Sequence, residues 1–406
     1  MANILISSLG TGNKTDQGYR KAKYGYKNEE IETTFISNAL CQMKELDINK
    51  LFLVGTTGSI WDSAYKEFST ESNYNEEIEL SLYEKIDVKE ISEKDLDVVN
   101  RTISEELGSE GSKCFIIDYG QNDKELWANF EKYLSILEHV DDDDVVYIDI
   151  THAFRSLSLM SFLMVQFGYV IKNKPFKVGG VFYGMIEATS DNNGITPVVD
   201  LKILYDLMEW IKAIDNFKNY ANGDLIASLL KDNTDLKKEY NLFNNYTKAM
   251  RIANMSAVKQ NINTISSKLQ ILEQSGNPII RLMSDEMKEF INRLDKEKMS
   301  DFQLALAEWY CEHKHYALSY MALAEAIVSK SCEVHEHRIN SEEGRNQAKK
   351  EIHKLSKELG KIYRTVNKIR NNIAHQLQNR KEAIDSDINM LPKYIADTRR
   401  IFQTIS

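Results

Sequence analysis

The stretch that decides the fold is residues 145–155, which read VVYIDITHAFR. Its first five residues are mostly β-branched or aromatic, a composition typical of a buried strand. From residue 156 to residue 171 the chain carries no charged side chain, so we expect a buried helix over 153–170. A strand that passes directly into a helix, with polar residues at the junction, is the repeating unit of a parallel α/β sheet.

Similar units occur on both sides of this stretch, up to residue 200. Short β-branched runs predict five strands, at 3–7, 51–54, 114–118, 145–150 and 178–183. Helical periodicity predicts four helices between them, at 28–46, 93–107, 123–140 and 153–170. This alternation predicts an α/β, Rossmann-like doubly wound domain, with a parallel sheet covered by helices on both faces.

After residue 200 the character of the sequence changes. Fourteen of the eighteen glycines lie before that point, and helical periodicity is almost continuous after it. We expect this half to be all helix, with breaks near Gly223, at 275–278, near Gly344 and before Pro392. The organisation predicted is a domain over 1–200, a helical connecting region over 201–300 and an all-α domain over 301–406.

One helix of the second half combines an apolar seam with a basic surface. Apolar residues recur at spacings of three and four from Ile352 to Ile373, which predicts one long helix. Between Arg345 and Lys381 there are eleven Lys or Arg and two acidic residues, a local charge of +9 on a chain whose net charge is −10. The net charge argues against a general polyanion binder, but the basic segment suits RNA. Its other interpretation is a solvated helix surface.

Composition limits the remaining possibilities. The chain has 406 residues, 42% hydrophobic and 28% charged, enough for more than one compact core. We find neither an export signal nor a membrane span, and expect a cytoplasmic protein with no membrane partner. The four cysteines are too scattered for a disulfide framework or a thiolate zinc finger, and we interpret them as packed thiols.

Two further groups of residues resemble metal ligands. The first contains six soft or borderline ligands, but not at the usual spacings of structural zinc: Cys311, His313, His315, Cys332, His335 and His337. We interpret it as a polar stretch beside the basic helix that could touch RNA. The second, Asp141–Asp144, precedes a strand directly and is better interpreted as an exposed turn. We therefore predict no metal site.

Ligand-binding candidates gather where the predicted strands end, because ligands of doubly wound sheets sit at the carboxyl edge. Glycine lets the backbone approach a ligand, and hydroxyl and amide side chains add neutral hydrogen bonds. Neither a Walker loop nor a G-x-G-x-x-G motif is present, which disfavours a nucleoside triphosphatase and a nicotinamide dehydrogenase. The candidates are Gly10, Thr11, Gly12, Asn13, Thr56, Thr57, Gly58, Ser59, Gly120, Gln121, Asn122, Asp149, Thr151, His152 and Arg155.

The last four of these candidates form the most specific pattern. Thr151 and His152 fall at a helix entrance, whose free N–H groups attract anions, and Arg155 lies one turn further on. A phosphate could be held there. The alternative is structural: Asp149 caps the helix, His152 is a satisfied core histidine and Arg155 forms an internal ion pair.

A second motif, Arg370-Asn371-Asn372-Ile373-Ala374-His375, stands near the end of the basic helix. A histidine can move a proton near neutral pH and a guanidinium can stabilise a charged phosphorane, so the pair suits RNA cleavage without metal. Asn371 and His375 share a helix face, and the amide could orient the imidazole. Arg370 and His375 are about 140° apart around an ideal helix. Either the helix ends there or the site combines two chains.

These two motifs resemble known families. Asp-x-Thr-His-x-x-Arg together with the Gly-Thr-Gly turn is similar to the CARF domain of CRISPR-associated proteins, over about residues 1–200. The Arg-Asn-x-x-x-His motif is similar to that of HEPN ribonucleases, over about residues 300–406. Together the motifs resemble the CARF–HEPN effector nucleases of the Csx and Csm type, which serve type III CRISPR systems.

The resemblance implies a function in antiviral defence. It implies a homodimer, or a higher oligomer, in which cyclic oligoadenylate binds across the two-fold axis as an allosteric activator. Cyclic tetra-adenylate is favoured and cyclic hexa-adenylate is the alternative. It further implies an endoribonuclease that cleaves single-stranded RNA without a cofactor, leaving a 2′,3′-cyclic phosphate and a 5′-hydroxyl, with Arg370, Asn371 and His375 as catalytic residues.

Two other hypotheses stay open at this point. In the first, the protein is a non-enzymatic regulator that senses a nucleotide and binds nucleic acid or a partner through its helical half. In the second, which is compatible with an RNase, the amino-terminal domain also cleaves its cyclic ligand slowly, with Thr11 or Thr57 near the scissile ribose.

Overall fold

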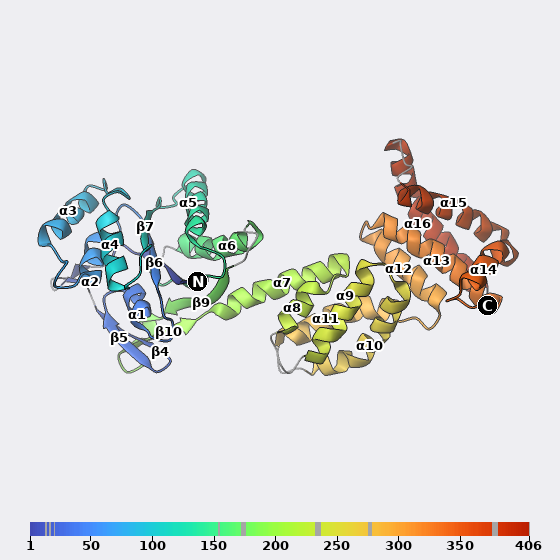
Figure 1. Cartoon of the computed structure of the whole chain (residues 1–406), viewed down its shortest axis with the longest axis horizontal. Helices are drawn as coiled ribbons and strands as arrows, with labels where there is room; N and C mark the ends of the chain where they lie inside the picture. Colours follow the sequence, from blue (N-terminus) through green and yellow to red (C-terminus); the bar gives the residue numbers. More distant parts are fainter. Residues whose placement is uncertain are drawn as a thin grey trace. The chain divides into compact units, whose positions relative to one another are not determined.

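The computed structural model describes residues 1–12, 14–15, 18–19, 21–152, 155–171, 176–231, 237–274, 278–375 and 381–405. The chain forms two compact units, Met1–Asp206 and Leu207–Ser406, shown in Figure 1. The first unit contains the sheet and the second is helical throughout its described residues. Each unit has its own hydrophobic core.

The first unit is built on an eight-stranded sheet of order β5-β4-β10-β9-β8-β1-β6-β7. Five of the strands are parallel neighbours and confirm the five predicted ones: β1 (Asn3–Leu9), β6 (Lys50–Gly55), β7 (Lys113–Ile116), β8 (Val145–Asp149) and β9 (Lys177–Gly184). The sheet is then extended by β10 (Ile195–Asp200), antiparallel to β9, and by the hairpin β4 (Ala22–Tyr26) and β5 (Glu29–Thr33). A separate two-residue ladder joins β2 (Lys14–Thr15) to β3 (Gly18–Tyr19).

Helices cover both faces of this sheet, as the doubly wound prediction requires (Figure 1). Side chains of β1 alternate between two cores: Leu5 packs in one, and Ile4 and Ile6 pack in the other. The first core includes α1 (Ile36–Gln42), α2 (Trp61–Phe68), α3 (Glu76–Asp87) and α4 (Asp97–Glu106). The second includes α5 (Asp123–Ile136), η1 (Leu137–His139) and α6 (Arg155–Ile171). Another short helix, η2 (Ile186–Ala188), precedes β10.

The helix predicted over 28–46 is wrong in its first half. Residues Glu29–Thr33 form β5, which pairs with β4 across a turn where Lys27 has a φ of 51°. Burial alternates along β5: Glu30 and Glu32 are exposed, whereas Ile31 and Thr33 point inward. The exposed residues thus have the period of two of a strand, and the helix begins only at Ile36.

The prediction that the uncharged helix is buried is also wrong for one of its faces. On α6, Leu157, Met164 and Val165 pack against the sheet. The opposite side exposes four apolar side chains at helical spacing: Leu159 (68% exposed), Leu163 (43%), Phe167 (45%) and Val170 (79%). We call these four residues the α6 apolar face. A helix without charges is fully buried only when other elements cover it on all sides, and that depends on tertiary structure.

The second unit is all helical across the residues that the structure describes, which confirms the prediction for them. One core runs through it from Trp210 to Phe402. Its helices are α7 (Lys202–Tyr220), which begins in the first unit, α8 (Asp224–Lys231), α9 (Lys237–Arg251), α10 (Met255–Glu273), α11 (Pro278–Leu294), α12 (Met299–Glu312), α13 (Tyr316–Val334), α14 (Glu342–Leu355), α15 (Lys357–Ala374) and α16 (Lys381–Thr404). Among the described helices, none has the length and apolar character of a bilayer span.

Two predicted helix boundaries are wrong. The apolar seam belongs to two helices, α14 and α15, because Ser356 is extended (φ −162°, ψ 134°) and its hydroxyl caps the amide of Leu359 at 3.3 Å. The seam itself is buried, as its spacing predicted. Pro392 does not interrupt the last helix, since α16 continues through it.

Candidate ligand pocket and ribonuclease motif

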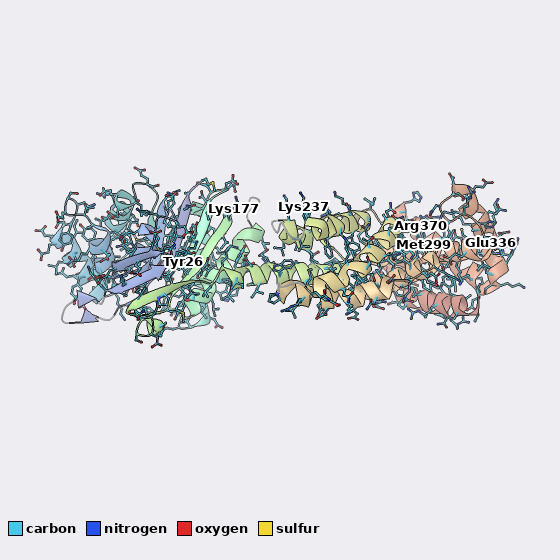
Figure 2. All side chains as sticks on the ribbon, turned by 90° about the horizontal axis from the view of Figure 1, so that it is seen from below. Tyr26, Lys177, Lys237, Met299, Glu336 and Arg370 are labelled. Atoms are coloured by element: carbon cyan, nitrogen blue, oxygen red, sulfur yellow. The ribbon has the colours of Figure 1, made fainter. Side chains whose placement is uncertain are left out.

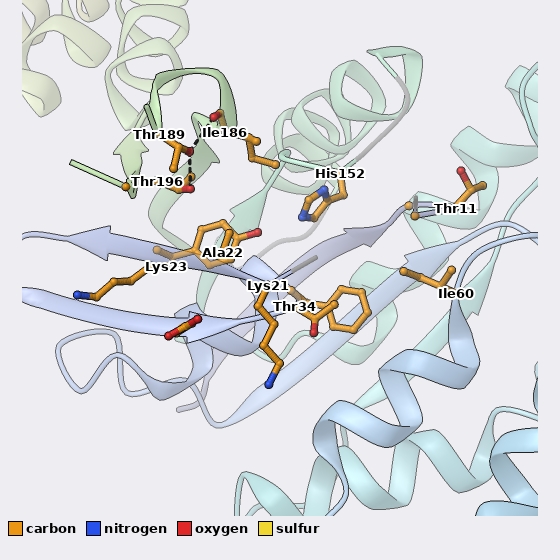
Figure 3. Close-up of a pocket in the computed structure, with 16 residues that line it drawn as sticks. Thr11, Lys21, Ala22, Lys23, Thr34, Ile60, His152, Ile186, Thr189 and Thr196 are labelled. Carbon is orange, nitrogen blue, oxygen red and sulfur yellow. Dashed lines mark hydrogen bonds between the residues drawn. The ribbon is translucent and has the colours of Figure 1, made fainter. Parts of the chain in front are cut away.

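A pocket of about 700 Å³ opens where β1 and β8 end in the first unit (Figure 3). The turn after β1 and the first residues after β8 form one side of it, and β4 with the η2–β10 segment forms the other. The lining residues are Gly10, Thr11, Gly12, Lys21, Ala22, Lys23, Tyr24, Glu32, Thr34, Phe35, Ile60, His152, Ile186, Thr189, Gly194 and Thr196. Of the predicted ligand residues, Gly10, Thr11, Gly12 and His152 therefore meet in one cavity.

His152 contributes a polar atom with an open hydrogen-bonding position to this pocket. Its Nε2 is buried and has no hydrogen-bond partner among the described residues. Figure 3 shows the ring pointing into the space between Ile186, Thr196 and β4. A Cβ at Gly10 would stand 3.2 Å from the carbonyl oxygen of His152, so the absence of a side chain lets the two loops approach closely. A buried nitrogen without a partner costs free energy unless a ligand satisfies it.

Asp149 and Thr151 act within the fold instead of lining the pocket. The Asp149 carboxylate accepts hydrogen bonds from the Ser7 hydroxyl (2.6 Å) and from the amide (2.9 Å) and hydroxyl (2.6 Å) of Thr151. The Thr151 hydroxyl in turn accepts one from the Gly184 amide at 2.8 Å. Burial raises the pKa of Asp149, opposed by nearby His152 and by these hydrogen bonds. The network ties β1, β8 and β9 together and sets the direction in which the chain leaves β8.

The predicted segment 56–59 contacts the backbone of the turn that lines the pocket. The Ser59 hydroxyl donates to the Leu9 carbonyl (2.7 Å) and accepts from the Thr56 amide (2.9 Å), and both residues are buried. The next amide, that of Ile60, donates to the Gly10 carbonyl at 3.2 Å. Thr57 and Gly58 do not line the pocket. The segment thus holds the Gly10 turn in place through its backbone.

The predicted segment 120–122 caps a helix. Asn122 Oδ1 accepts from the Glu125 amide (3.1 Å), while Glu125 accepts from the Gln121 amide (2.9 Å) and from Asn122 Nδ2 (2.7 Å). Gly120, with a φ of 75°, makes the turn that leads into α5. None of these three residues lines the pocket. Of the remaining candidates, Asn13 and the side chain of Arg155 lie outside the described residues.

The β4 and η2–β10 walls were not anticipated from the sequence. The β4 side contributes Lys21 and Lys23, both exposed, and Lys23 pairs with Glu30 across the hairpin. The other wall contributes Thr189 and Thr196, whose hydroxyls are hydrogen-bonded at 2.7 Å (Figure 3). The alternation from Glu30 to Thr33 was the available signal for the hairpin, but the helix predicted over 28–46 included these residues.

In the second unit, the Arg-Asn-x-x-x-His motif that resembles a ribonuclease motif occupies the last turn of α15. Arg370 is half-buried, and its Nη1 donates to Asn371 Oδ1 at 3.1 Å. His375 caps the helix, is exposed, and donates its backbone amide to the Asn371 carbonyl at 2.9 Å. The amide side chain thus contacts the arginine, not the imidazole that we expected it to orient. Because the helix stays regular to Ala374, Arg370 and His375 of one chain point in different directions.

Arg370 lies at the edge of a second cavity, of about 340 Å³, which we call the motif cavity. Figure 2 labels Arg370 and Met299, two of its lining residues. Arg345 also lines it and pairs with Glu325. Glu325 lines the cavity as well, and the other walls are the segments 253–256 and 339–342 together with Gln303 and Met321. The cavity therefore includes residues of both the 201–300 and the 301–406 parts of the sequence.

The His and Cys residues that resembled a metal site are used in packing and ion pairs. His313 stacks on Trp309 with ring centroids 4.1 Å apart. His337 bonds to Glu351 (Nε2 to Oε2, 2.7 Å), whose pKa is lowered to about 2 by hydrogen bonds from Lys354 and then His337. Within the described ranges, no three His, Cys, Asp or Glu residues are grouped so as to bind a metal ion.

Comparisons with known proteins agree with the two-part architecture. Residues 4–187 match the CARF domain of the CRISPR system endoribonuclease Csx1, and residues 206–301 match the second domain of the CRISPR-associated protein MJ1674. An alignment of this chain with the CRISPR-associated protein MJ1674 of Methanocaldococcus jannaschii shows 30% identity over 355 residues. It covers 82% of this chain and 55% of that protein. The chain thus spans about half the length of this relative.

A solved structure, Enterococcus italicus Csm6 bound to cyclic hexa-2′-fluoro-hexa-dAMP, aligns over 100% of this chain and 94% of its own, with 12% identity and a TM-score of 0.41. The family match shows a CARF domain over residues 4–187. There the carboxyl edge of a doubly wound sheet holds a glycine turn and a histidine whose Nε2 has no partner among the described residues. The match over residues 4–187 and the similarity to MJ1674 support a CARF-containing type III CRISPR effector.

Proposed function

We propose that this protein is an endoribonuclease switched on by cyclic oligoadenylate. The ligand is expected in the pocket of the first unit, and single-stranded RNA at the Arg370–His375 motif of the second. The observation that carries the first part is His152, which lines the pocket and whose buried Nε2 has no partner among the residues that the structure describes. The second part rests on an Arg-Asn-x-x-x-His motif placed at the end of a helix behind a CARF domain.

The charges of the two units suit these separate roles. Residues 1–206 contain 20 basic and 35 acidic residues, so a phosphate ligand must be held there by local donors and not by the overall field. The Gly10–Gly12 backbone, His152 and the rim lysines Lys21 and Lys23 are such donors. Residues 207–406 contain 31 basic and 26 acidic residues, a net +5 that attracts RNA.

A homodimer completes the proposal, because Arg370 and His375 of one chain point in different directions and a symmetric ring ligand needs two copies of the pocket. The α6 apolar face is exposed, and α6 carries no charge after Arg155. In a two-fold contact each side chain near the axis meets its own copy, so a neutral apolar face avoids like-charge repulsion. We place the dimer contact of the first unit there. The ligand, a ring of phosphates and adenines, would then lie across the axis, with cyclic tetra-adenylate favoured over cyclic hexa-adenylate.

The chemistry proposed is an internal transfer at one phosphate of RNA. The ribose 2′-oxygen forms a bond to phosphorus as it loses its proton, and the bond from phosphorus to the 5′-oxygen breaks as that oxygen gains one. His375 takes part in these proton transfers, Arg370 stabilises the charged phosphate and Asn371 positions the guanidinium at 3.1 Å. The products are a 2′,3′-cyclic phosphate and a 5′-hydroxyl, and no step uses a metal ion.

The test is RNA cleavage in the presence of a chelator, with and without a panel of cyclic oligoadenylates. We expect cleavage only with one ring size, undiminished by chelator, with cyclic phosphate ends. Cleavage that disappears with chelator would contradict the mechanism. RNA binding without cleavage under every condition would favour the non-enzymatic regulator.

Slow cleavage of the cyclic ligand by the first unit remains a compatible proposal. Of the two threonines considered for it, Thr11 lines the pocket and Thr57 does not. We therefore assign that role to Thr11. Incubation of labelled cyclic oligoadenylate with the Thr11→Ala and Thr57→Ala variants separates the two residues.

A further inference from the structure

The second unit has another cavity, of about 630 Å³, lined by residues of α12, α13 and α16. It shares no lining residue with the motif cavity, and the proposed RNA cleavage does not use it. We call it the Lys330 cavity, after the buried lysine that lines it. Its volume lies within the usual range of small-ligand pockets.

Lys330, on α13, is a buried cation without a counter-ion among the described residues. It is 4% exposed, and its ammonium group lies over the ring of Phe402, 5.4 Å from the centroid. No residue that the structure describes accepts a hydrogen bond from this ammonium group. Its nitrogen keeps accessible surface, unlike the buried Oε1 of Glu308 in the same cavity. Lysine is seldom buried unless it is paired, so the cavity calls for an anion.

Two further lysines line the Lys330 cavity from the turn before α12. Lys296 is half-buried and Lys298 is exposed, and neither forms an ion pair with a described residue. The ammonium group of Lys259 donates a hydrogen bond to the carbonyl of Lys296. The turn is therefore held in place while its two lysine side chains are left for a ligand.

Two carboxylates also line the cavity, and they set the charge that a matching ligand carries. Glu308 is paired with Arg399, which lines the cavity too, and with Arg293. Asp301 offsets one of the three lysines, which leaves a net charge of +2. A phosphate monoester carries about −2 near neutral pH, whereas a carboxylate or one diester of an RNA backbone carries about −1. The charge of the cavity therefore favours a monoester.

We infer that the Lys330 cavity is a second ligand site, for an organic phosphate monoester of nucleotide size. Lys330 holds the phosphate from within, and the apolar side chains of Leu304, Ala305 and Phe402 contact the organic part. The RNA fragments of the proposed cleavage end in a cyclic phosphate and a hydroxyl, so they do not supply this ligand. It comes from a different class of reaction, a hydrolysis that leaves a terminal monoester.

The experiment is a calorimetric titration of the full chain with uridine 5′-monophosphate at constant ionic strength. This probe contains no adenine, which the pocket of the first unit is expected to bind. It should bind on the order of tenfold more tightly than uridine, which lacks the phosphate. It should also bind more tightly than inorganic phosphate, which lacks the organic part. Equal affinity for the nucleotide and for either of these two parts would overturn the inference.

The variant Lys330→Met removes the charge and keeps the length of the side chain. It should weaken the binding of uridine 5′-monophosphate by about tenfold or more, and leave the affinity for oligouridine RNA with a 5′-hydroxyl unchanged. The matched control is Lys212→Met, at a half-buried lysine that pairs with Glu209 at 2.8 Å and does not line the cavity. It should leave both affinities unchanged. If Lys330→Met weakens RNA binding and the nucleotide does not bind, the cavity holds a backbone diester and the assignment is wrong.

A melting curve separates ligand binding from a structural role of Lys330. Removal of a buried charge without a counter-ion should leave the Tm of the free protein equal or raise it. A lower Tm with unchanged nucleotide affinity would show that Lys330 only packs against Phe402, and would contradict the assignment. Lys298→Ala, at an exposed residue, tests the site even where Lys330→Met does not fold. It should weaken nucleotide binding by about twofold to fivefold, and an unchanged affinity would again contradict the inference.

Discussion

Replacing Asp149 with alanine tests whether this residue holds the fold or the ligand. Its carboxylate is 1% exposed and accepts three hydrogen bonds, at 2.6, 2.6 and 2.9 Å. Bonds to a charged group contribute about 1.5–3 kcal/mol each. Asp149→Ala leaves the Ser7 hydroxyl and two donors of Thr151 without their acceptor, but it also removes the cost of burying the carboxylate, which raises the pKa of Asp149. The net loss of stability should be about 4 kcal/mol.

A loss of that size is easy to detect. In a unit of about 200 residues, 1 kcal/mol changes Tm by roughly 2–4 °C, so the transition of the first unit should fall by about 10 °C. Calorimetry of the full chain measures it. The control is Asp118→Ala, an exposed aspartate that follows β7 as Asp149 ends β8, with an expected change within about 0.5 kcal/mol. A Tm within about 2 °C of the parent, together with complete loss of cyclic oligoadenylate binding, would refute the reasoning.

The other predictions concern the two sites, the dimer and pH. His375→Ala should abolish RNA cleavage and leave the affinity for cyclic oligoadenylate, measured by titration calorimetry, unchanged. His152→Ala should weaken that affinity by tenfold or more. If the two variants have the same effects, the sites are not separate. Phe167→Glu on the α6 apolar face should halve the mass found by light scattering. Leu282→Glu, at a still more exposed leucine on α11, should not; a dimer that survives Phe167→Glu must use another surface. Burial raises the pKa of Glu67, but hydrogen bonds from two threonines and an asparagine outweigh it and the net pKa is lowered. Its ionised form therefore stabilises the fold, so the parent should lose more stability than Glu67→Gln as the pH falls below about 4.5, and parallel acid unfolding curves would contradict this.

The parallel sheet could be predicted because its signals are local. Each central strand is a β-branched run bounded by turn residues, and burial on both faces leaves little room for another interpretation. The β4–β5 hairpin was missed because Glu29, Glu30 and Glu32 also suit the exposed side of a helix. Whether such a segment is strand or helix is decided by a neighbour, and its neighbour β10 lies about 170 residues away in the sequence.

The ligand candidates show a different limit. The sequence selects polar residues at the ends of strands, but a backbone turn needs the same hydroxyls and amides that a ligand needs. Ser59 and Asn122 bond to backbone groups, and His152 faces a cavity. The residue types at these positions are similar. Only the direction of each side chain shows whether it supports the backbone of a turn or faces the pocket. The break at Ser356 escaped prediction for a related reason, because apolar spacing continues unchanged across it.

The turn after β8 leads within seven positions from His152 to Leu159, the first residue of the α6 apolar face. If His152 binds the cyclic nucleotide and the α6 apolar face forms the dimer contact, one short segment of eight residues serves both functions. Random mutation cannot easily refine one trait without disturbing the other. Relatives that bind a different cyclic nucleotide should therefore also differ in their dimer contacts. Two distant relatives that each form a homodimer should fail to form a heterodimer with one another.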